Sequence, residues 1–514
     1  MNLGLAFSRN ARNTPDALAS FTGDRFVTWA EVNERACRLA NLLIDRYGVG
    51  RGDRVAVLVS NRIEVLEAVG GCAKAGAVYV GLNFRLGEPE YREIFDNCTP
   101  TVVITDGDLA PMVSRLTEGT GVAVLNVDAP ESYAAQLADA SAEPPGSEQT
   151  ISLTDDFCIV YSSGTTGRPK GILFNVGAVL QHASVAVREY EMSASTRWLT
   201  VIPHNSSMQI TIAPLVLLGG AIGFADSRGF RPDRFIAEIR QYNITHTFLV
   251  PTMLVRLLEA GASADDVPTL QTIGYGSAPI SPDRVRMLVE RFGPVFVQLY
   301  GMAEISSIGT MLRKSDHEEA AAGRPELLST CGRESLLVTV RLIDDEGNEV
   351  GPGEPGEIVF GTPYTMTGYY DEPDRTAEAL LDGWMHSGDI GQWVEGGYLK
   401  IVGRKKDLII RGGFNIAPTE IENVLTLHEG ILEAAVVGIE NDEWGESIAA
   451  AVVSTGDRAL TANELQRWCK ENGLPSIKIP ERLEFWEDLP RNAVGKITKA
   501  QVRDQFSATE VRES

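Results

Sequence analysis

Residues Tyr161–Gly171 read YSSGTTGRPKG, and this stretch decides how the rest of the chain is interpreted. Its glycines let a loop fold tightly with the backbone N–H groups pointing inward, and such a nest of donors binds anions. Its serines and threonines add hydroxyl donors, and Lys170 adds a full positive charge. The stretch therefore predicts a loop that holds the phosphates of a nucleotide.

The sequence around the loop supports this interpretation. The apolar run 157–161 predicts a buried strand, and open α/β sheets bind ligands at the carboxyl ends of their strands. The spacing is not that of the GxxxxGKS or GxxxxGKT loop, because Lys170 lies three residues after Gly167 and Pro169 intervenes. A flexible connection rich in glycine, serine and threonine is the alternative, and composition alone does not exclude it.

Length and composition limit the possible classes of protein. A chain of 514 residues with 44% hydrophobic residues can form two or more domains with substantial cores. The chain has 46 basic and 70 acidic residues, so its net charge is −24 and nucleic acid is not an expected partner. The six scattered cysteines indicate reduced, mostly buried thiols in a cytoplasmic protein. The apolar run Ile210–Ala225 is too short to cross a bilayer and predicts a buried helix leading into a strand, so we expect no stable membrane insertion.

The first part of the chain alternates between helical and strand patterns. Thr28 and Glu31 form a capping box, and apolar residues at helical spacing follow it. Strands are predicted at 54–59, 77–81 and 101–105, with a helix over 63–74. This alternation is typical of a doubly wound parallel sheet. The segment 128–154 is rich in Ala, Ser, Glu and Pro and is expected to lie at the surface.

The last hundred residues have a different and more compact pattern. A helix is predicted over 418–427, followed by strands at 433–439 and 447–454. A capping box at Thr461 and Glu464 starts another helix, and 482–486 predicts a final strand. These elements predict a small α+β domain.

The stretch 161–171 resembles the phosphate-loop signature of the adenylate-forming superfamily, which includes acyl-CoA synthetases, aryl-CoA ligases, luciferases and peptide-synthetase adenylation domains. Further motifs resemble that family in its usual order. They are GSAPI (276–280), QLYGMAE (298–304), GEPGEIVF (353–360), MTGYY (366–370), DGWMHSGD (382–389), GRKKD (403–407), RGGFNIAPTEIE (411–422) and GK (495–496). The resemblance covers nearly the whole chain.

The resemblance implies roles for individual residues. It implies that Lys170, Glu304 and Lys496 are catalytic, with Glu304 also binding Mg²⁺. Tyr300 would pack on adenine, and Asp389 would accept hydrogen bonds from the ribose. The complete set implied for ATP and AMP is Ser162, Ser163, Gly164, Thr165, Thr166, Gly167, Gly276, Ser277, Ala278, Tyr300, Gly301, Asp389 and Arg404. As a charge cluster alone, residues 404–406 would form a solvated turn.

The resemblance also places an acyl pocket, a hinge and a thiol channel. The residues implied for the acyl pocket are His204, Asn205, Ser206, Leu299 and Ser307, with Ser207 and Ser306 beside them. A lone histidine such as His204 is more often structural. Lys406 occupies the hinge position, and Gly413 the channel for coenzyme A. Two residues depart from the family pattern, Ala303 in place of threonine and Leu299 in place of glycine. The polar residues and Leu299 predict a small, aromatic or polar acid.

The implied fold is α/β, with a large N-terminal domain (1–403) of doubly wound sheets and a β-rich subdomain, and a small mobile α+β domain (404–514). The implied reaction is ATP-dependent and forms acyl-AMP and pyrophosphate, then acyl-CoA and AMP. ATP, Mg²⁺ and coenzyme A are the expected cofactors, and the enzyme is expected to be a monomer or homodimer. An enzyme that loads a separate carrier protein, and a non-catalytic relative that binds nucleotide or acyl groups, remain alternatives.

Overall fold

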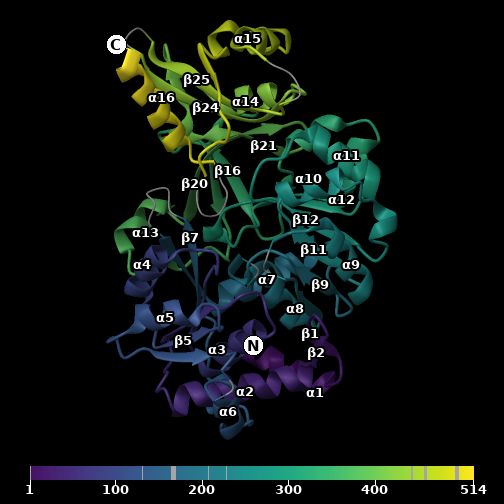
Figure 1. Ribbon diagram of the computed structural model, residues 1–514, viewed down its shortest axis with the longest axis vertical. Coiled ribbons are helices and arrows are strands. Elements are labelled where there is room, and N and C mark those ends of the chain that lie inside the picture. Colours follow the sequence, from purple (N-terminus) through teal and green to yellow (C-terminus); the bar gives the residue numbers. More distant parts are fainter. Residues whose placement is uncertain are drawn as a thin grey trace. The chain divides into compact units, whose positions relative to one another are not determined.

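The computed structural model describes residues 2–129, 131–163, 169–206, 208–226, 229–441, 444–456, 460–491 and 497–513 (Figure 1). The chain forms two compact units. One comprises Met1–Val340 and Phe360–Met385, and the other comprises Arg341–Val359 and His386–Ser514. The expected mixed α/β architecture is confirmed. The predicted boundary at 403–404, between a large domain and a small mobile domain, stays a prediction.

A seven-stranded sheet in the first unit carries the glycine-rich loop. Its order is β18-β8-β7-β4-β3-β5-β6. The strands are β3 (Arg54–Leu58), β4 (Val78–Gly81), β5 (Val102–Thr105), β6 (Ala123–Asn126), β7 (Asp156–Ser163), β8 (Pro169–Asn175) and β18 (Gly368–Tyr369). The strands β3 to β7 are parallel, as the alternation predicts. At one edge, β8 pairs antiparallel with β7, and β18 pairs antiparallel with β8.

Helices cover this sheet because their apolar faces match its buried strands. Side chains of α4 (Glu88–Cys98) and α5 (Ala110–Thr117) form one core with those of β3, β4 and β7. The helix α2 (Trp29–Asp45) packs against α3 (Glu64–Ala75). The predicted capping box of Thr28 and Glu31 starts α2.

The second sheet of this unit has nine strands in the order β15-β14-β13-β12-β11-β9-β10-β1-β2. They are β1 (Leu18–Thr22), β2 (Arg25–Thr28), β9 (Arg197–Thr200), β10 (Ala221–Phe224), β11 (His246–Leu249), β12 (Thr272–Tyr275), β13 (Phe296–Tyr300), β14 (Thr310–Leu312) and β15 (Arg333–Glu334). The other helices of this unit are α1 (Leu3–Asn13), α6 (Ala134–Asp139), α7 (Val176–Glu189), α8 (Ala213–Leu218), α9 (Pro232–Tyr242), α10 (Pro251–Glu259), α11 (Pro282–Phe292), α12 (Lys314–Ala321) and α13 (Pro373–Ala379). The apolar run 210–225 forms the end of a π-helix (Met208–Ile212), then α8 and β10, which confirms a buried helical segment leading into a strand.

The remaining strands form two smaller sheets. One has the order β16-β17-β20-β19, with β21 paired to β20. Its strands are β16 (Thr339–Ile343), β17 (Gly356–Gly361), β19 (Leu380–Leu381), β20 (Trp384–Val394) and β21 (Tyr398–Arg404). The other contains β22 (Ile409–Arg411), β23 (Phe414–Ile416), β24 (Ile431–Asn441), β25 (Gly445–Ser454) and β26 (Arg482–Phe485), with helices α14 (Pro418–Thr426), α15 (Ala462–Glu471) and α16 (Lys499–Glu513). Of these C-terminal elements, α14, β24, β25, α15 and β26 match those predicted from the sequence, whereas β22, β23 and α16 were not predicted.

Most of the described residues in the segment 128–154 are exposed, as its composition predicts, but a few are buried. Its Tyr133 and Leu137 are buried, and Glu148 is 1% exposed. The Glu148 carboxylate accepts a hydrogen bond from Lys74 Nζ at 2.8 Å, inside the first unit. An expectation based on average composition missed these three residues, because each is surrounded in sequence by residues typical of surfaces.

All six cysteines are buried free thiols, which agrees with the expectation of buried, reduced cysteines. Among the described residues, no helix is both long and apolar enough to cross a membrane.

Candidate active site

The glycine-rich loop connects two antiparallel strands. Ser162 of β7 lies opposite Lys170 of β8, so the hairpin fixes both residues at the base of the loop. The loop residues Gly164, Thr165, Thr166 and Gly167 and the side chain of Ser163 lie outside the described part of the structure. A strand–loop–strand arrangement differs from the strand–loop–helix of the GxxxxGKS type, as the position of Lys170 predicted.

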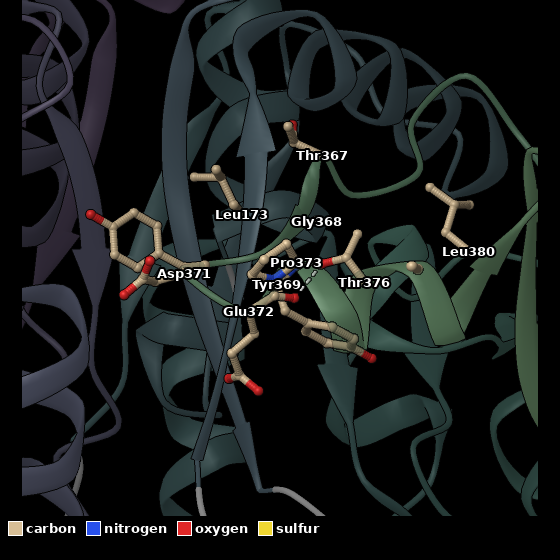
Figure 2. A pocket seen from close by; sticks show the side chains of 11 residues that line it. Leu173, Thr367, Gly368, Tyr369, Asp371, Glu372, Pro373, Thr376 and Leu380 are labelled. Carbon is tan, nitrogen blue, oxygen red and sulfur yellow. Dashed lines mark hydrogen bonds between the residues drawn. The ribbon is translucent and has the colours of Figure 1, made fainter.

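A tyrosine that the sequence analysis did not single out joins two predicted catalytic residues. The Tyr369 hydroxyl donates a hydrogen bond to Oε1 of Glu304 at 2.7 Å. Lys170 Nζ lies 5.4 Å from the centre of the Tyr369 ring, within the range of a cation–π interaction. Figure 2 shows Tyr369 beside Thr376 and Glu372. The one available signal for Tyr369 was its place in the MTGYY motif.

Glu304 lies in a short 3₁₀ turn, Ala303–Ile305, and is 7% exposed. Burial and the neighbouring Glu304 carboxylate raise the pKa of Tyr369 above its ordinary value, so the phenol stays protonated and acts as the donor.

Among the described residues, no cluster of three or more His, Cys, Asp or Glu side chains could hold a metal ion. A single carboxylate such as Glu304 fits Mg²⁺ that is bound mainly by phosphate oxygens and water.

The backbone next to Glu304 is held in an uncommon conformation. Ser306 and Ser307 both have positive φ, +57° and +76°. A Cβ atom added to Gly301 would lie 2.6 Å from the Ser307 carbonyl oxygen, so the chain approaches itself closely here. Strained backbone of this kind is concentrated at functional sites. Tyr300 lies at the end of β13, with its ring 6.0 Å from that of Phe360.

The predicted adenine-binding turn follows β12. Ser277 has φ +68°, and both Ser277 and Ala278 are exposed. A Cβ atom added to Gly276 would lie 2.6 Å from the Leu299 carbonyl oxygen, so glycine is required by this close approach. Leu299 itself is 4% exposed and packs beside Gly276.

His204 has partners for both ring nitrogens. Its Nε2 lies 3.1 Å from the Val59 carbonyl oxygen and its Nδ1 lies 3.2 Å from the Tyr79 hydroxyl. Burial lowers the pKa of His204 to about 4, so the ring is neutral, with Nε2 as donor and Nδ1 as acceptor. These contacts favour a structural role for His204, and its place in the acyl pocket stays a prediction.

Other residues predicted for the acyl pocket differ in exposure. Asn205 and Ser306 are buried, and among the described residues neither Asn205 Oδ1 nor Ser306 Oγ has a hydrogen-bond partner. Ser206 is exposed, and Ser307 is half-buried. Ser207 lies outside the described residues. A buried polar atom without a partner is costly, so both unpaired atoms are candidates for contact with a ligand or water.

The second unit brings together Asp389 and Arg404. They are cross-strand partners of β20 and β21, and Arg404 Nε lies 2.9 Å from Asp389 Oδ1. Asp389 is 8% exposed, whereas about half of the Arg404 side chain is exposed. The carboxylate predicted for the ribose is therefore oriented by the arginine predicted for ribose or phosphate.

The predicted hinge and channel residues also belong to the second unit. Lys406 is exposed in the 3₁₀ turn Lys405–Asp407, directly after β21. Gly412 and Gly413 form the two-residue turn between β22 and β23, with φ of +54° and +81°. A tight hairpin turn of this type requires positive φ at both central residues, which explains the two glycines. Lys496 lies outside the described residues.

The chain is similar to known families, relatives and solved structures. The model of the AMP-binding enzyme family matches residues 7–370, and that of the AMP-binding enzyme C-terminal domain matches 420–496. The chain is 36% identical over 501 residues to a feruloyl-CoA synthase from Amycolatopsis sp, covering 97% of this chain and 98% of the relative. It is 33% identical to an indoleacetate–CoA ligase from Aromatoleum aromaticum, covering 98% of each. The solved structure of ATP-bound MatB from Rhodopseudomonas palustris superposes with a TM-score of 0.87 at 27% identity, covering 98% of this chain and 99% of that one.

Proposed function

The chain belongs to the AMP-binding enzyme family, and from this premise we propose that it converts a small, aromatic or polar carboxylic acid into its coenzyme A thioester. It is an acid–thiol ligase that uses ATP and coenzyme A. The proposal adds the class of acid and the residues that carry each step.

The main support for the class of acid comes from two buried oxygen atoms, Asn205 Oδ1 and Ser306 Oγ, which have no hydrogen-bond partner among the described residues. Burying them against an alkyl chain would cost about 1–3 kcal/mol each, whereas a polar substituent could bond to one of them. Leu299 adds a four-carbon side chain where the family has glycine, which reduces the space for a long acyl chain. The names of two similar proteins, which refer to feruloyl-CoA and indoleacetate, agree with an aromatic acid.

In the first step, a carboxylate oxygen of the acid attacks the α-phosphorus of ATP. The new P–O bond forms as the bond to pyrophosphate breaks, so acyl-AMP and pyrophosphate result. The barrier comes from bringing two anions together, and preorganised positive charge lowers it. We assign this role to Lys170 and Lys496. Bound Mg²⁺, held by Glu304, would offset phosphate charge.

In the second step, the thiol of coenzyme A attacks the acyl carbonyl carbon and AMP leaves as the carbon–oxygen bond breaks. We propose that the C-terminal domain (404–514) turns about Lys406 between the steps and withdraws Lys496. The thiol arm would then pass Gly413, which borders open space: a Cβ atom added there would have no other atom within 4 Å. Asp389 and Arg404 would hold the ribose in both steps.

The test measures pyrophosphate release from ATP and Mg²⁺ with a panel of acids, first without and then with coenzyme A. We expect release to depend on the acid, and a thioester to form when free coenzyme A is added. Release without thioester, followed by acyl transfer to an added carrier protein, would replace coenzyme A by a carrier as the acceptor. Nucleotide binding without any pyrophosphate release would contradict the proposal.

We further propose that the enzyme acts in the cytoplasm, since its six cysteines are free thiols and such thiols persist in a reducing compartment. Monomer and homodimer are both compatible with this proposal.

A further inference from the structure

We propose that Tyr369 is a positioning residue for the adenylation step, with its hydroxyl orienting Glu304 for Mg²⁺ and its ring orienting Lys170. The inference rests on the proposed function, because it names a further residue of the same reaction. Tyr369 joins elements that are far apart in the sequence, β8, β18 and the turn 303–305.

Backbone contacts hold Tyr369 in place, in addition to the contacts of its side chain. β18 pairs with β8, which places Tyr369 opposite Ile172. The Tyr369 N–H donates to Oγ1 of Thr376 at 2.9 Å, on the helix α13 that follows (Figure 2). Gly368 permits this approach, since a Cβ atom there would lie 3.0 Å from Thr376 Cγ2. The ring of Tyr369 is therefore attached to backbone that is held by strand pairing and a hydrogen bond.

Two hydrogen bonds tie the strand region to Glu304. The Met366 N–H donates to the Glu304 carbonyl oxygen at 2.8 Å, and the Tyr369 hydroxyl donates to Glu304 Oε1 at 2.7 Å. In the described part of the chain, the Tyr369 hydroxyl is the one side chain that hydrogen-bonds to this carboxylate. A buried carboxylate needs a donor, and a single donor on Oε1 leaves Oε2 for a cation.

The ring of Tyr369 contacts two positive side chains. Lys170 Nζ lies 5.4 Å from the ring centre, and Arg375 Cζ lies 5.3 Å from it. Arg375 is also paired with Glu372 at 2.9 Å, and Lys170 lies at the base of the phosphate-loop hairpin. An aromatic face attracts a cation, so the ring of Tyr369 helps to orient the Lys170 ammonium.

Two substitutions distinguish the role of the Tyr369 hydroxyl from that of its ring. Tyr369→Phe removes the hydrogen bond to Glu304 and keeps an aromatic face for Lys170, whereas Tyr369→Leu removes both. Tyr370→Phe is the matched control, because Tyr370 is the next residue and its hydrogen bonds to β8 and α4 are made by its backbone. Thermal unfolding of each variant shows whether the fold is retained.

The readout is ATP binding measured by calorimetry over a series of Mg²⁺ concentrations, without any acid present. We expect Tyr369→Phe to need about tenfold more Mg²⁺ for half-maximal ATP affinity, because a hydrogen bond to a charged group is lost. Tyr370→Phe should match the wild type. In a Glu304→Gln background, Tyr369→Phe should add no further shift, because the hydroxyl acts through that carboxylate.

Kinetics supply a second readout. Tyr369→Phe should slow acyl-AMP formation about tenfold or more and leave thioester formation from supplied acyl-AMP unchanged. Tyr369→Leu should slow the first step further, because Lys170 also loses its support.

Three results would overturn the inference while leaving the proposed function intact. They are equal Mg²⁺ requirements for Tyr369→Phe and Tyr370→Phe, additive shifts in the Glu304→Gln background, and equal losses in both half-reactions. A wild-type protein that binds ATP but releases no pyrophosphate with any acid would instead refute the proposed function itself.

Discussion

Leu299 can be both a core residue and a wall of the acyl pocket. It is 4% exposed and its side chain packs beside Gly276. Leu299→Ala should therefore destabilise the protein by about 2–5 kcal/mol, as expected for a truncated buried leucine. If Leu299 also limits the pocket, the same variant should shift relative kcat/KM towards larger acids. Chemical unfolding and an acid panel measure the two effects. A loss of stability without any shift in preference would assign Leu299 to the core alone.

Glu64 makes stability depend on pH. It is 6% exposed on α3 and accepts hydrogen bonds from Arg62 and Arg25. Burial alone would raise the pKa of Glu64, but these hydrogen bonds and charges outweigh burial and lower it below its ordinary value of 4.5. A lowered folded-state pKa stabilises the protein above the unfolded-state pKa, and this contribution disappears as the pH falls through the folded-state pKa.

Glu64→Gln should therefore reduce the free energy of unfolding at pH 7 by about 1–3 kcal/mol, with the partial exposure of Arg25 taken into account. The difference from the wild type should shrink below about pH 4. Urea unfolding at several pH values measures it. Glu88→Gln is the control, because Glu88 makes its arginine contacts at the surface. A difference that is constant with pH would refute the role of Glu64.

At the scale of elements, the short turn after β21 is the proposed hinge. Lys406 lies in the 3₁₀ turn Lys405–Asp407, where no strand pairing restrains it. Proline fixes φ and so hinders a backbone rotation, whereas alanine does not. Lys406→Pro should leave adenylation near the wild-type rate and slow thioester formation, and Lys406→Ala should change neither. Separate assays of the two half-reactions provide the measurement. Normal thioester formation by Lys406→Pro would exclude Lys406 as the hinge.

Elements with local signals were predictable from the sequence. The capping box at Thr28 and Glu31 starts α2, the one at Thr461 and Glu464 starts α15, and the apolar run before the glycine-rich loop is β7. Each signal depends on residues within a few positions of one another, so spacing alone identifies it.

Contacts between distant segments were not predictable in this way. Tyr369 and Glu304 are 65 residues apart, and Lys74 and Glu148 are 74 apart. No local pattern marks these pairs, because the partners are distant in the sequence and only the fold brings them together. The two hydrogen bonds of His204 are a further example, because its partners Tyr79 and Val59 lie more than a hundred residues away; its place in the acyl pocket stays a prediction.

At the scale of the whole molecule, we propose that the two half-reactions take place in two different conformations. Lys496 is proposed to act only in the first, where its charge would offset that of the α-phosphate. Lys496→Ala should raise the barrier to adenylation by about 2–4 kcal/mol and leave thioester formation from supplied acyl-AMP near the wild-type rate. Lys499→Ala is the control, because Lys499 is paired with Glu422 at 2.8 Å. Equal losses in both half-reactions would contradict the division.

We propose that the chain forms coenzyme A thioesters of small, aromatic or polar acids. The most direct test is a competition in which acetate, butyrate, benzoate, hydroxybenzoate, ferulate, octanoate and palmitate compete at equal concentrations. ATP, Mg²⁺ and coenzyme A are present, and mass spectrometry identifies the acyl-CoA products at early times. We predict that thioesters of the aromatic, hydroxylated or short acids dominate. Palmitoyl-CoA as the main product, or consumption of ATP without any acyl-CoA, would contradict the account.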